Sequence, residues 1–197
     1  VYNAMAAAAC AKILGVSVPM IAAGLSGLPR VSGRLEHIAR YRGADIFVDF
    51  AHTPDGLEKS LTALRKHCGG RLICVFGCGG NRDALKRPIM GETAAKIADF
   101  CVLTSDNPRY EDPFDIILQI EEGVRRVSDE YVIVVDRECG IGYALDMLKA
   151  GDVLLIAGKG GENYQEIMGV RHIYNDVSAV KQMLSERLAS EKGNNES

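Results

Sequence analysis

The feature that most constrains the fold is a regular alternation of short apolar segments with segments of helical periodicity. Five runs rich in aliphatic and β-branched residues occur along the chain, at 46–50, 72–76, 100–104, 131–135 and 153–157. Between these runs apolar residues recur every three or four positions, as in the series Leu57, Leu61 and Leu64. Nearly continuous apolar strands that alternate with amphipathic helices are typical of a parallel sheet covered on both faces. The sequence therefore predicts an α/β domain with a Rossmann-like, doubly wound, mostly parallel sheet flanked by helices.

Residues at the ends of the periodic segments support this alternation. Thr53 and Asp112 each precede a proline, which indicates a capping side chain followed by proline at the first helical position. Gly69 and Gly151 follow the ends of helical segments, where glycine is common. Ser178 is expected to open a last amphipathic helix.

Composition divides the chain into three parts. Residues 1–31 contain two short helical segments with too little bulk for a core of their own, and a stretch punctuated by proline and glycine, 28–33, reads as a linker. Residues 32–190 form the predicted α/β domain, and the polar residues 191–197 are expected to be a disordered tail. Because a helical segment begins at once without an initiator methionine, we expect the chain to be part of a longer protein.

Composition also excludes several classes of protein. The net charge is −3 and the basic residues are dispersed, which argues against nucleic-acid binding. The longest apolar runs have the length of strands, so no membrane span is expected. The six cysteines follow no metal-ligand spacing, and several lie in apolar stretches. They are interpreted as reduced structural thiols of a cytoplasmic protein.

Polar or glycine-rich strings follow the predicted strands. The first strand ends in Asp49, which is placed to accept hydrogen bonds from a ribose or simply to form a turn, with His52 in the loop that follows. The second is followed by the glycine-rich string 77–83, which is neither GxGxxG nor a phosphate-binding loop. Its Arg82 is a candidate for carboxylate binding, because the planar guanidinium suits that group.

Two further strand ends carry candidate residues. Asn107 and Arg109 are either donors to a substrate carboxylate or part of an ordinary Asx-Pro turn. Glu162, in a glycine-rich loop, is suited to an ammonium group, although a flexible loop with a stray acid is the alternative. Lys86 and Arg87 are expected to be a solvated helix start. Because the carboxyl ends of parallel strands meet at one edge, these side chains together favour a site for a zwitterion.

Five strings resemble, in order and spacing, those of the Mur ligases, the ATP-dependent amide ligases of peptidoglycan biosynthesis. They cover residues 49–55, 76–83, 86–91, 105–109 and 157–162. The resemblance extends over nearly the whole chain. It implies a ligase with a UDP-substrate domain, a central ATPase domain and a C-terminal Rossmann-like domain that binds the amino acid.

The resemblance implies where this chain belongs in such a ligase. Residues 1–31 would be the last helices of the central ATPase domain, and residues 32–190 would be the C-terminal domain. The phosphate-binding loop and the Mg²⁺ ligands would lie in the missing N-terminal and central domains. The chain alone is therefore expected to be inactive and to bind neither ATP nor Mg²⁺ tightly.

The resemblance also implies roles for individual residues. Asn3 would face adenine, Arg34 would reach the nucleotide phosphates and Asp49 would hold the ribose. The implied amino-acid site consists of Arg82, Asp106, Asn107, Pro108, Arg109, Gly158 and Glu162. The Asp-Asn-Pro-Arg string at 106–109 is similar to that of members that add meso-diaminopimelate to UDP-N-acetylmuramoyl-L-alanyl-D-glutamate through an acyl phosphate.

Two departures and two alternatives accompany the resemblance. Phe50 stands where relatives commonly have tyrosine, and Gly161 stands where many have histidine, so the loop that carries Glu162 is expected to shift more easily. One alternative is a ligase of the same class that adds L-lysine or another diamino acid. The other is a Rossmann-type binding module without catalysis.

Overall fold

The computed structural model describes residues 2–28 and 31–195. The chain divides between Val31 and Ser32 into two compact units, which is also the predicted boundary. The first unit consists of helices α1 (Tyr2–Ile13) and α2 (Val18–Ser26), and α2 has no buried residue. The assignment of this unit to a central ATPase domain stays a prediction. The predicted linker includes residues 29–30, which lie outside the described residues.

The second unit is built on a six-stranded sheet of order β1-β2-β6-β3-β4-β5. Its strands are β1 (Glu36–Tyr41), β2 (Ala44–Asp49), β3 (Leu72–Phe76), β4 (Phe100–Leu103), β5 (Tyr131–Ile133) and β6 (Val153–Ala157). All of them run parallel except β1, which pairs antiparallel with β2 at one edge. The predicted fold class is confirmed. The sequence did not indicate β1, because this half-buried edge strand has no continuous apolar run and a bulge interrupts its register between His37 and Ala39.

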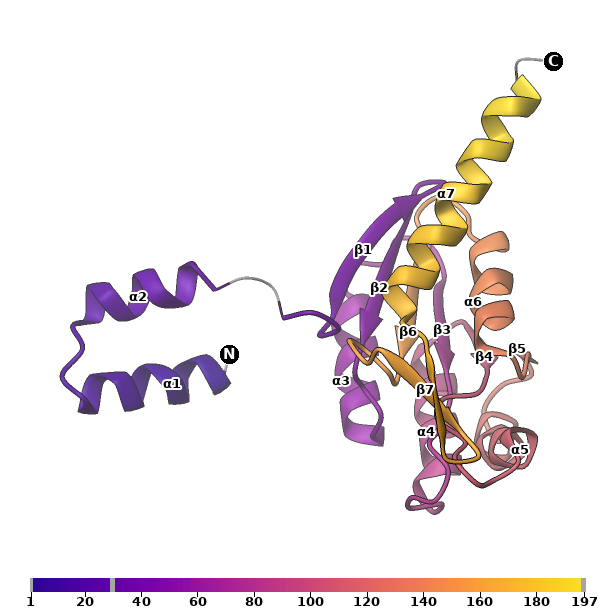
Figure 1. The fold of residues 1–197 in the computed structure, drawn as a ribbon, viewed down its shortest axis with the longest axis horizontal. Helices are drawn as coiled ribbons and strands as arrows, with labels where there is room; N and C mark the ends of the chain where they lie inside the picture. Colours follow the sequence, from indigo (N-terminus) through magenta and orange to yellow (C-terminus); the bar gives the residue numbers. More distant parts are fainter. Residues whose placement is uncertain (1, 29–30, 196–197) are drawn as a thin grey trace. The chain divides into compact units, whose positions relative to one another are not determined.

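Helices cover both faces of this sheet, as Figure 1 shows. One layer consists of α3 (Pro54–Arg65), α4 (Lys86–Ile97) and α5 (Pro113–Val124), and the other of α6 (Arg137–Asp146) and α7 (Asp176–Asn195). The predicted stripe of Leu57, Leu61 and Leu64 is buried against the sheet. Both predicted caps are present: the Thr53 hydroxyl accepts from Gly56 N at 3.2 Å, and the Asp112 carboxylate accepts from Phe114 N at 2.7 Å. Among the described helices, none has the length and apolarity to cross a membrane.

The predicted disordered tail is wrong for residues 191–195, because α7 continues to Asn195. The helix is fixed to the sheet by buried Val180 and Leu184. Farther along, the Glu191 carboxylate accepts hydrogen bonds from the Tyr41 hydroxyl at 3.1 Å and from Arg42 Nη2 at 2.8 Å. These contacts extend the helix into a polar segment that composition alone assigns to disorder. Residues 196–197 lie outside the described part of the chain.

Arg87 also differs from its prediction as a solvated residue, since its side chain is only 1% exposed. The guanidinium donates to both Glu111 carboxylate oxygens, at 2.8 and 3.0 Å, and to Gln119 Oε1 at 3.0 Å. It also reaches the Gly79 carbonyl at 3.3 Å. The start of α4 therefore packs against α5. Through Arg87 it also connects the glycine-rich turn after β3 with the loop before α5.

Helices α4 and α5 approach each other through glycine. A Cβ on Gly123 would lie 1.8 Å from the Pro88 carbonyl oxygen, which belongs to the helix backbone. Alanine in place of helical glycine usually stabilises by about 1 kcal/mol. We expect Gly123→Ala to destabilise the protein by about 2 kcal/mol instead, because the helices must separate. Denaturant unfolding measures this, with Gly142→Ala on α6 as the control, where the nearest atom lies at 3.7 Å. A Gly123→Ala protein as stable as wild type would contradict the expectation.

The order of the strands reverses within the sheet, between β3 and β6. The chain proceeds outward from β3 to β4 and β5, and then returns to insert β6 between β3 and β2. In such sheets the loops beyond the carboxyl ends of the strands separate at this point and leave room for a ligand. A two-stranded hairpin, β7 (Tyr164–Ile167) and β8 (Val170–Ile173), follows β6 and contacts the loop after β4 at Arg109.

Candidate amino-acid site

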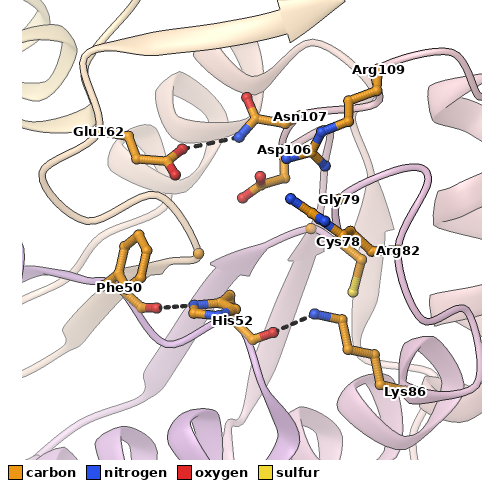
Figure 2. Close-up of a pocket in the computed structure, with 12 residues that line it drawn as sticks. Phe50, His52, Cys78, Gly79, Arg82, Lys86, Asp106, Asn107, Arg109 and Glu162 are labelled. Atoms are coloured by element: carbon orange, nitrogen blue, oxygen red, sulfur yellow. Dashed lines mark hydrogen bonds between the residues drawn. The ribbon is translucent and has the colours of Figure 1, made fainter.

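A cavity of about 210 Å³ opens at the carboxyl ends of β2, β3, β4 and β6, and Figure 2 shows the side chains around it. Its lining residues are Phe50, His52, Gly77, Cys78, Gly79, Arg82, Lys86, Asp106, Asn107, Arg109, Gly158 and Glu162. Six residues of the implied amino-acid site are thus brought together from three separate loops. The remaining one, Pro108, is buried behind the lining, with its carbonyl against Gly80.

Asn107 has an amide whose orientation is determined by its neighbours. Its Oδ1 accepts from Glu166 N at 2.9 Å and from Lys159 Nζ at 2.9 Å, two groups that only donate. Its Nδ2 therefore turns the other way, where it donates to Glu162 Oε2 at 3.0 Å. Asn107 thus presents a donor on the side of the cavity that Glu162 lines.

Arg109 is held in the lining by its backbone and by its side chain. Its φ of 52° lies in the left-handed region, and its backbone N donates to Glu166 O of the hairpin at 3.0 Å. The guanidinium donates from Nη1 to the Gly80 carbonyl at 2.8 Å, while Nε lies 3.5 Å from Glu166 Oε2. These contacts orient the guanidinium and leave part of its hydrogen-bonding capacity for a ligand. Arg82 lies beside Arg109 near Gly79 (Figure 2), and it takes part in no ion pair among the described residues.

Asp106 and Gly158 meet at the floor of the cavity. Burial raises the pKa of the Asp106 carboxyl above its ordinary value, while the nearby positive charges of Arg137 and Lys159 act in the opposite direction. Gly158 has a φ of +115°, and a Cβ there would lie 2.5 Å from Asp106 Oδ2. Only glycine meets both conditions without strain. The loop after β6 therefore passes close to the acid that follows β4.

The residues implied to bind nucleotide are not gathered in this cavity. Asn3 is exposed on α1, in the first unit. Arg34 is exposed, and its guanidinium lies 4.6 Å from the centroid of the Phe50 ring. The Asp49 carboxylate is occupied by internal hydrogen bonds from Leu35 N at 2.6 Å, Ala51 N at 3.0 Å and the Ser60 hydroxyl at 2.8 Å. The nucleotide roles of these residues stay predictions.

The two departures from the family strings each have a structural counterpart. Phe50 lacks a hydroxyl but provides a ring that stacks with Arg34 and contacts His52 edge-on at 4.7 Å between centroids. Gly161 is exposed, yet the loop around it is fixed, since Glu162 N donates to Lys159 O at 3.0 Å and the Asn175 amide donates to Glu162 O at 3.0 Å. In this structure the glycine does not release Glu162 from the site.

Sequence reasoning missed Lys159, the fully buried lysine between Gly158 and Gly160 of the last string. Lysine is almost never fully buried unless it is paired, so a lysine at this position predicted an exposed loop. Sequence reasoning placed Lys86 in a solvated helix start, whereas this half-buried residue begins α4 and lines the cavity, with its ammonium donating to the His52 carbonyl at 2.7 Å (Figure 2). The only sequence signal for either residue was its place inside a family string.

The cavity offers binding groups rather than a nucleophile. Burial raises the pKa of the Cys78 thiol to about 12, so this thiol stays protonated at neutral pH. Within residues 2–28 and 31–195, no three His, Cys, Asp or Glu side chains are grouped as a metal site. Guanidinium groups, an amide donor and two acids around one small space have charges that suit a zwitterion. The fold and this cavity define a Rossmann-like domain with a candidate ligand site at the carboxyl edge of its sheet.

The chain belongs to the Mur ligase family. The family described as "Mur ligase, glutamate ligase domain" matches residues 33–160, which include β1 to β6 and most of the cavity lining. The recognition made from the five strings is therefore confirmed, and with it the membership in a family of ATP-dependent amide ligases.

Relatives with curated names share the same designation. The chain is 47% identical over 187 residues to the UDP-N-acetylmuramoyl-L-alanyl-D-glutamate--2,6-diaminopimelate ligase of Caldanaerobacter subterraneus subsp. tengcongensis, covering 94% of this chain and 38% of that protein. It is 48% identical over 194 residues to the ligase of the same name from Chlorobium phaeobacteroides, covering 97% of this chain and 38% of the relative. The chain thus spans about 38% of the length of these relatives.

Solved structures agree with this assignment. A structure of a UDP-N-acetylmuramoyl-L-alanyl-D-glutamate--2,6-diaminopimelate ligase superposes with a TM-score of 0.75 at 38% identity, covering 93% of this chain and 37% of that one. A UDP-N-acetylmuramate-alanine ligase from Thermotoga maritima superposes with a TM-score of 0.67 at 18% identity, covering 96% of this chain and 37% of that one, and shows the shared fold alone.

Proposed function

We propose that this chain is the amino-acid-binding part of an ATP-dependent ligase that joins meso-diaminopimelate to UDP-N-acetylmuramoyl-L-alanyl-D-glutamate in peptidoglycan biosynthesis. The observation that carries the proposal is the gathering of Arg82, Asn107, Arg109 and Glu162 around one cavity. The names of the similar ligases support the choice of substrates. We place the reaction in the cytoplasm, in keeping with six free cysteines.

The charges of the cavity fit the chemistry of this diamino acid. Meso-diaminopimelate differs from L-lysine by a second carboxylate. The guanidinium groups of Arg82 and Arg109 are suited to a carboxylate, and the Asn107 amide supplies a further donor. Glu162 and Asp106 supply negative charge for an ammonium group. A site that holds a partly buried arginine such as Arg109 for the second carboxylate disfavours a ligand without it, because the arginine is then left unpaired.

The proposed reaction begins when ATP phosphorylates the γ-carboxylate of the D-glutamyl residue and releases ADP. The neutral amine of diaminopimelate then attacks the acyl phosphate, the tetrahedral intermediate expels phosphate, and the amine loses a proton as the amide forms. On this proposal the phosphate-binding loop and the Mg²⁺ ligands lie in a part of the ligase outside these residues. The domain described here contributes mainly by holding the amine in place, which is worth up to about 7–11 kcal/mol of a bimolecular barrier.

The proposal is tested by comparing two amino acids. Calorimetric titration of the full-length ligase, and of this chain by itself, should show that meso-diaminopimelate binds at least ~100-fold more tightly than L-lysine. The same assay on an Arg109→Ala protein should remove most of that difference. Equal affinity of the wild-type protein for the two amino acids would favour a ligase for lysine or another diamino acid. Binding of neither would leave only a non-catalytic module.

A further inference from the structure

We propose that Lys159 is a positioning residue that orients Asn107 and Glu162 toward the incoming amino acid without touching it. The inference rests on the proposed function. The Lys159 side chain is 0% exposed, and it does not line the cavity. Its Nζ lies 2.9 Å from Asn107 Oδ1 and 3.2 Å from Glu162 Oε2, so it contacts both residues from behind.

A buried ammonium group is costly unless it is paired and hydrogen-bonded. Lys159 meets this condition through Glu162 and Asn107, and its charge also acts on the buried Asp106 carboxyl. The Tyr164 ring lies beside it, with Nζ 5.6 Å from the ring centroid. These contacts with Asn107, Glu162 and Tyr164 hold the Lys159 ammonium in one position. The ammonium in turn orients Asn107 and Glu162, which line the cavity.

Lys159 joins loops that the sheet does not join. Asn107 follows β4, whereas Lys159 and Glu162 follow β6, and β3 lies between these two strands. β4 and β6 are not paired, and the backbone bonds that join the two loops, between Arg109 and the hairpin residues Glu166 and Met168, lie beyond Lys159 and Glu162. The triangle of Lys159, Asn107 and Glu162, with sides of 2.9, 3.0 and 3.2 Å, spans this gap. It fixes the donor of Asn107 relative to the carboxylate of Glu162.

Removal of the ammonium should disturb both partners. Asn107 Oδ1 would keep only its bond from Glu166 N, and Glu162 Oε2 would keep only Asn107 Nδ2. Asp106 and Glu162 would also lose a nearby positive charge, which makes the cavity more negative. The first effect releases the Asn107 donor and the Glu162 carboxylate from their fixed positions, and the second opposes the binding of the two carboxylates of the ligand.

The test is Lys159→Met, which removes the charge and keeps most of the side-chain volume. We expect it to weaken meso-diaminopimelate binding by about tenfold or more, and to raise the KM for this amino acid in the full-length ligase. The KM for ATP should change less than about twofold. Lys149→Met, an exposed lysine in the loop before β6, is the matched control and should match wild type.

A double-mutant cycle separates positioning from general stability. If Lys159 acts through Glu162, the Lys159→Met and Glu162→Gln effects should be non-additive, with a combined loss at least about tenfold smaller than the product of the single losses. Additive losses, or equal changes in both KM values, would show a merely structural role and overturn the proposal. If wild-type protein fails to bind the amino acid, the proposed function fails. If wild type binds and Lys159→Met binds equally well, only the positioning role fails.

A measurement on unsubstituted Lys159 covers the case in which Lys159→Met does not fold. A buried, hydrogen-bonded ammonium exchanges its protons slowly enough for NMR detection of its ¹⁵Nζ signal. Saturation with meso-diaminopimelate should shift this signal in the wild-type chain, and the shift should be reduced in Glu162→Gln. A signal that does not respond to bound amino acid would overturn the proposal.

Discussion

Arg109→Ala in the full-length ligase should raise the KM for meso-diaminopimelate on the order of 100-fold or more, while the KM for ATP stays nearly unchanged. Loss of one partner from a desolvated, hydrogen-bonded charge pair costs about 2–5 kcal/mol of binding energy. The Arg109 side chain is 18% exposed and lines the cavity, so a carboxylate bound there is partly removed from water. Steady-state kinetics with each substrate varied in turn measures the effect.

Two further variants show whether a large rise in the KM for diaminopimelate comes from the lost guanidinium of Arg109. Arg109→Lys keeps the charge but not the planar fork that now spans the Gly80 carbonyl and Glu166, so it should recover only a small part of the affinity. Arg125→Ala removes an exposed guanidinium at the end of α5 and should leave both KM values unchanged. An Arg109→Ala enzyme with an unchanged KM for diaminopimelate would remove this arginine from the site. A parallel rise in the KM for ATP would indicate a general disturbance of the domain.

The central strands and the edge at which they end were predictable, because their signals are local. The apolar runs of β2, β3, β4 and β6 are continuous, and helices with capping residues such as Thr53 and Asp112 follow two strands of the sheet. Once such strands are taken as parallel, their carboxyl ends must lie at one edge. The meeting of Arg82, Asp106 and Glu162 around one cavity follows from that geometry.

What the sequence did not indicate depends on pairing between distant residues. Arg87 was expected in solvent because an arginine at a helix start usually lies there, and its burial depends on Glu111, 24 positions later. Lys159 is buried because Asn107, in the loop after β4, offers an acceptor. The helical residues 191–195 depend on contacts of Glu191 with β1. In each case a polar residue finds its partner far along the chain, and only the folded structure shows which residue that partner is.

The buried ion pair of Arg137 and Asp176 is expected to be the polar contact on which the stability of the second unit depends most. The side chains are 1% and 0% exposed. Arg137 donates to Asp176 from Nε and from Nη2, each at 2.8 Å, and its Nη2 also donates to the Ala157 carbonyl at 3.0 Å. Ala157 ends β6, directly before Gly158 of the cavity lining. One pair therefore ties the start of α6 to the start of α7 and to the strand end that carries the site.

Asp176→Asn should destabilise the protein by about 3–5 kcal/mol, because it leaves the guanidinium buried without its counter-charge. For a domain of this size the melting temperature should fall on the order of 10 °C. Asp55→Asn is the matched control: Asp55 pairs with Lys59 at 2.7 Å but is 75% exposed, so its loss should be under ~0.5 kcal/mol. Calorimetric or denaturant unfolding measures both.

The double variant Arg137→Met with Asp176→Leu then identifies the cause of the loss. If the single substitution is harmful because a charge is left unpaired, removal of both charges should recover much of the stability. The recovered protein should still bind diaminopimelate more weakly, since the Ala157 carbonyl loses its donor and the loop that begins at Gly158 is held less firmly. An Asp176→Asn protein as stable as the Asp55→Asn control would show that the buried pair contributes no net stability.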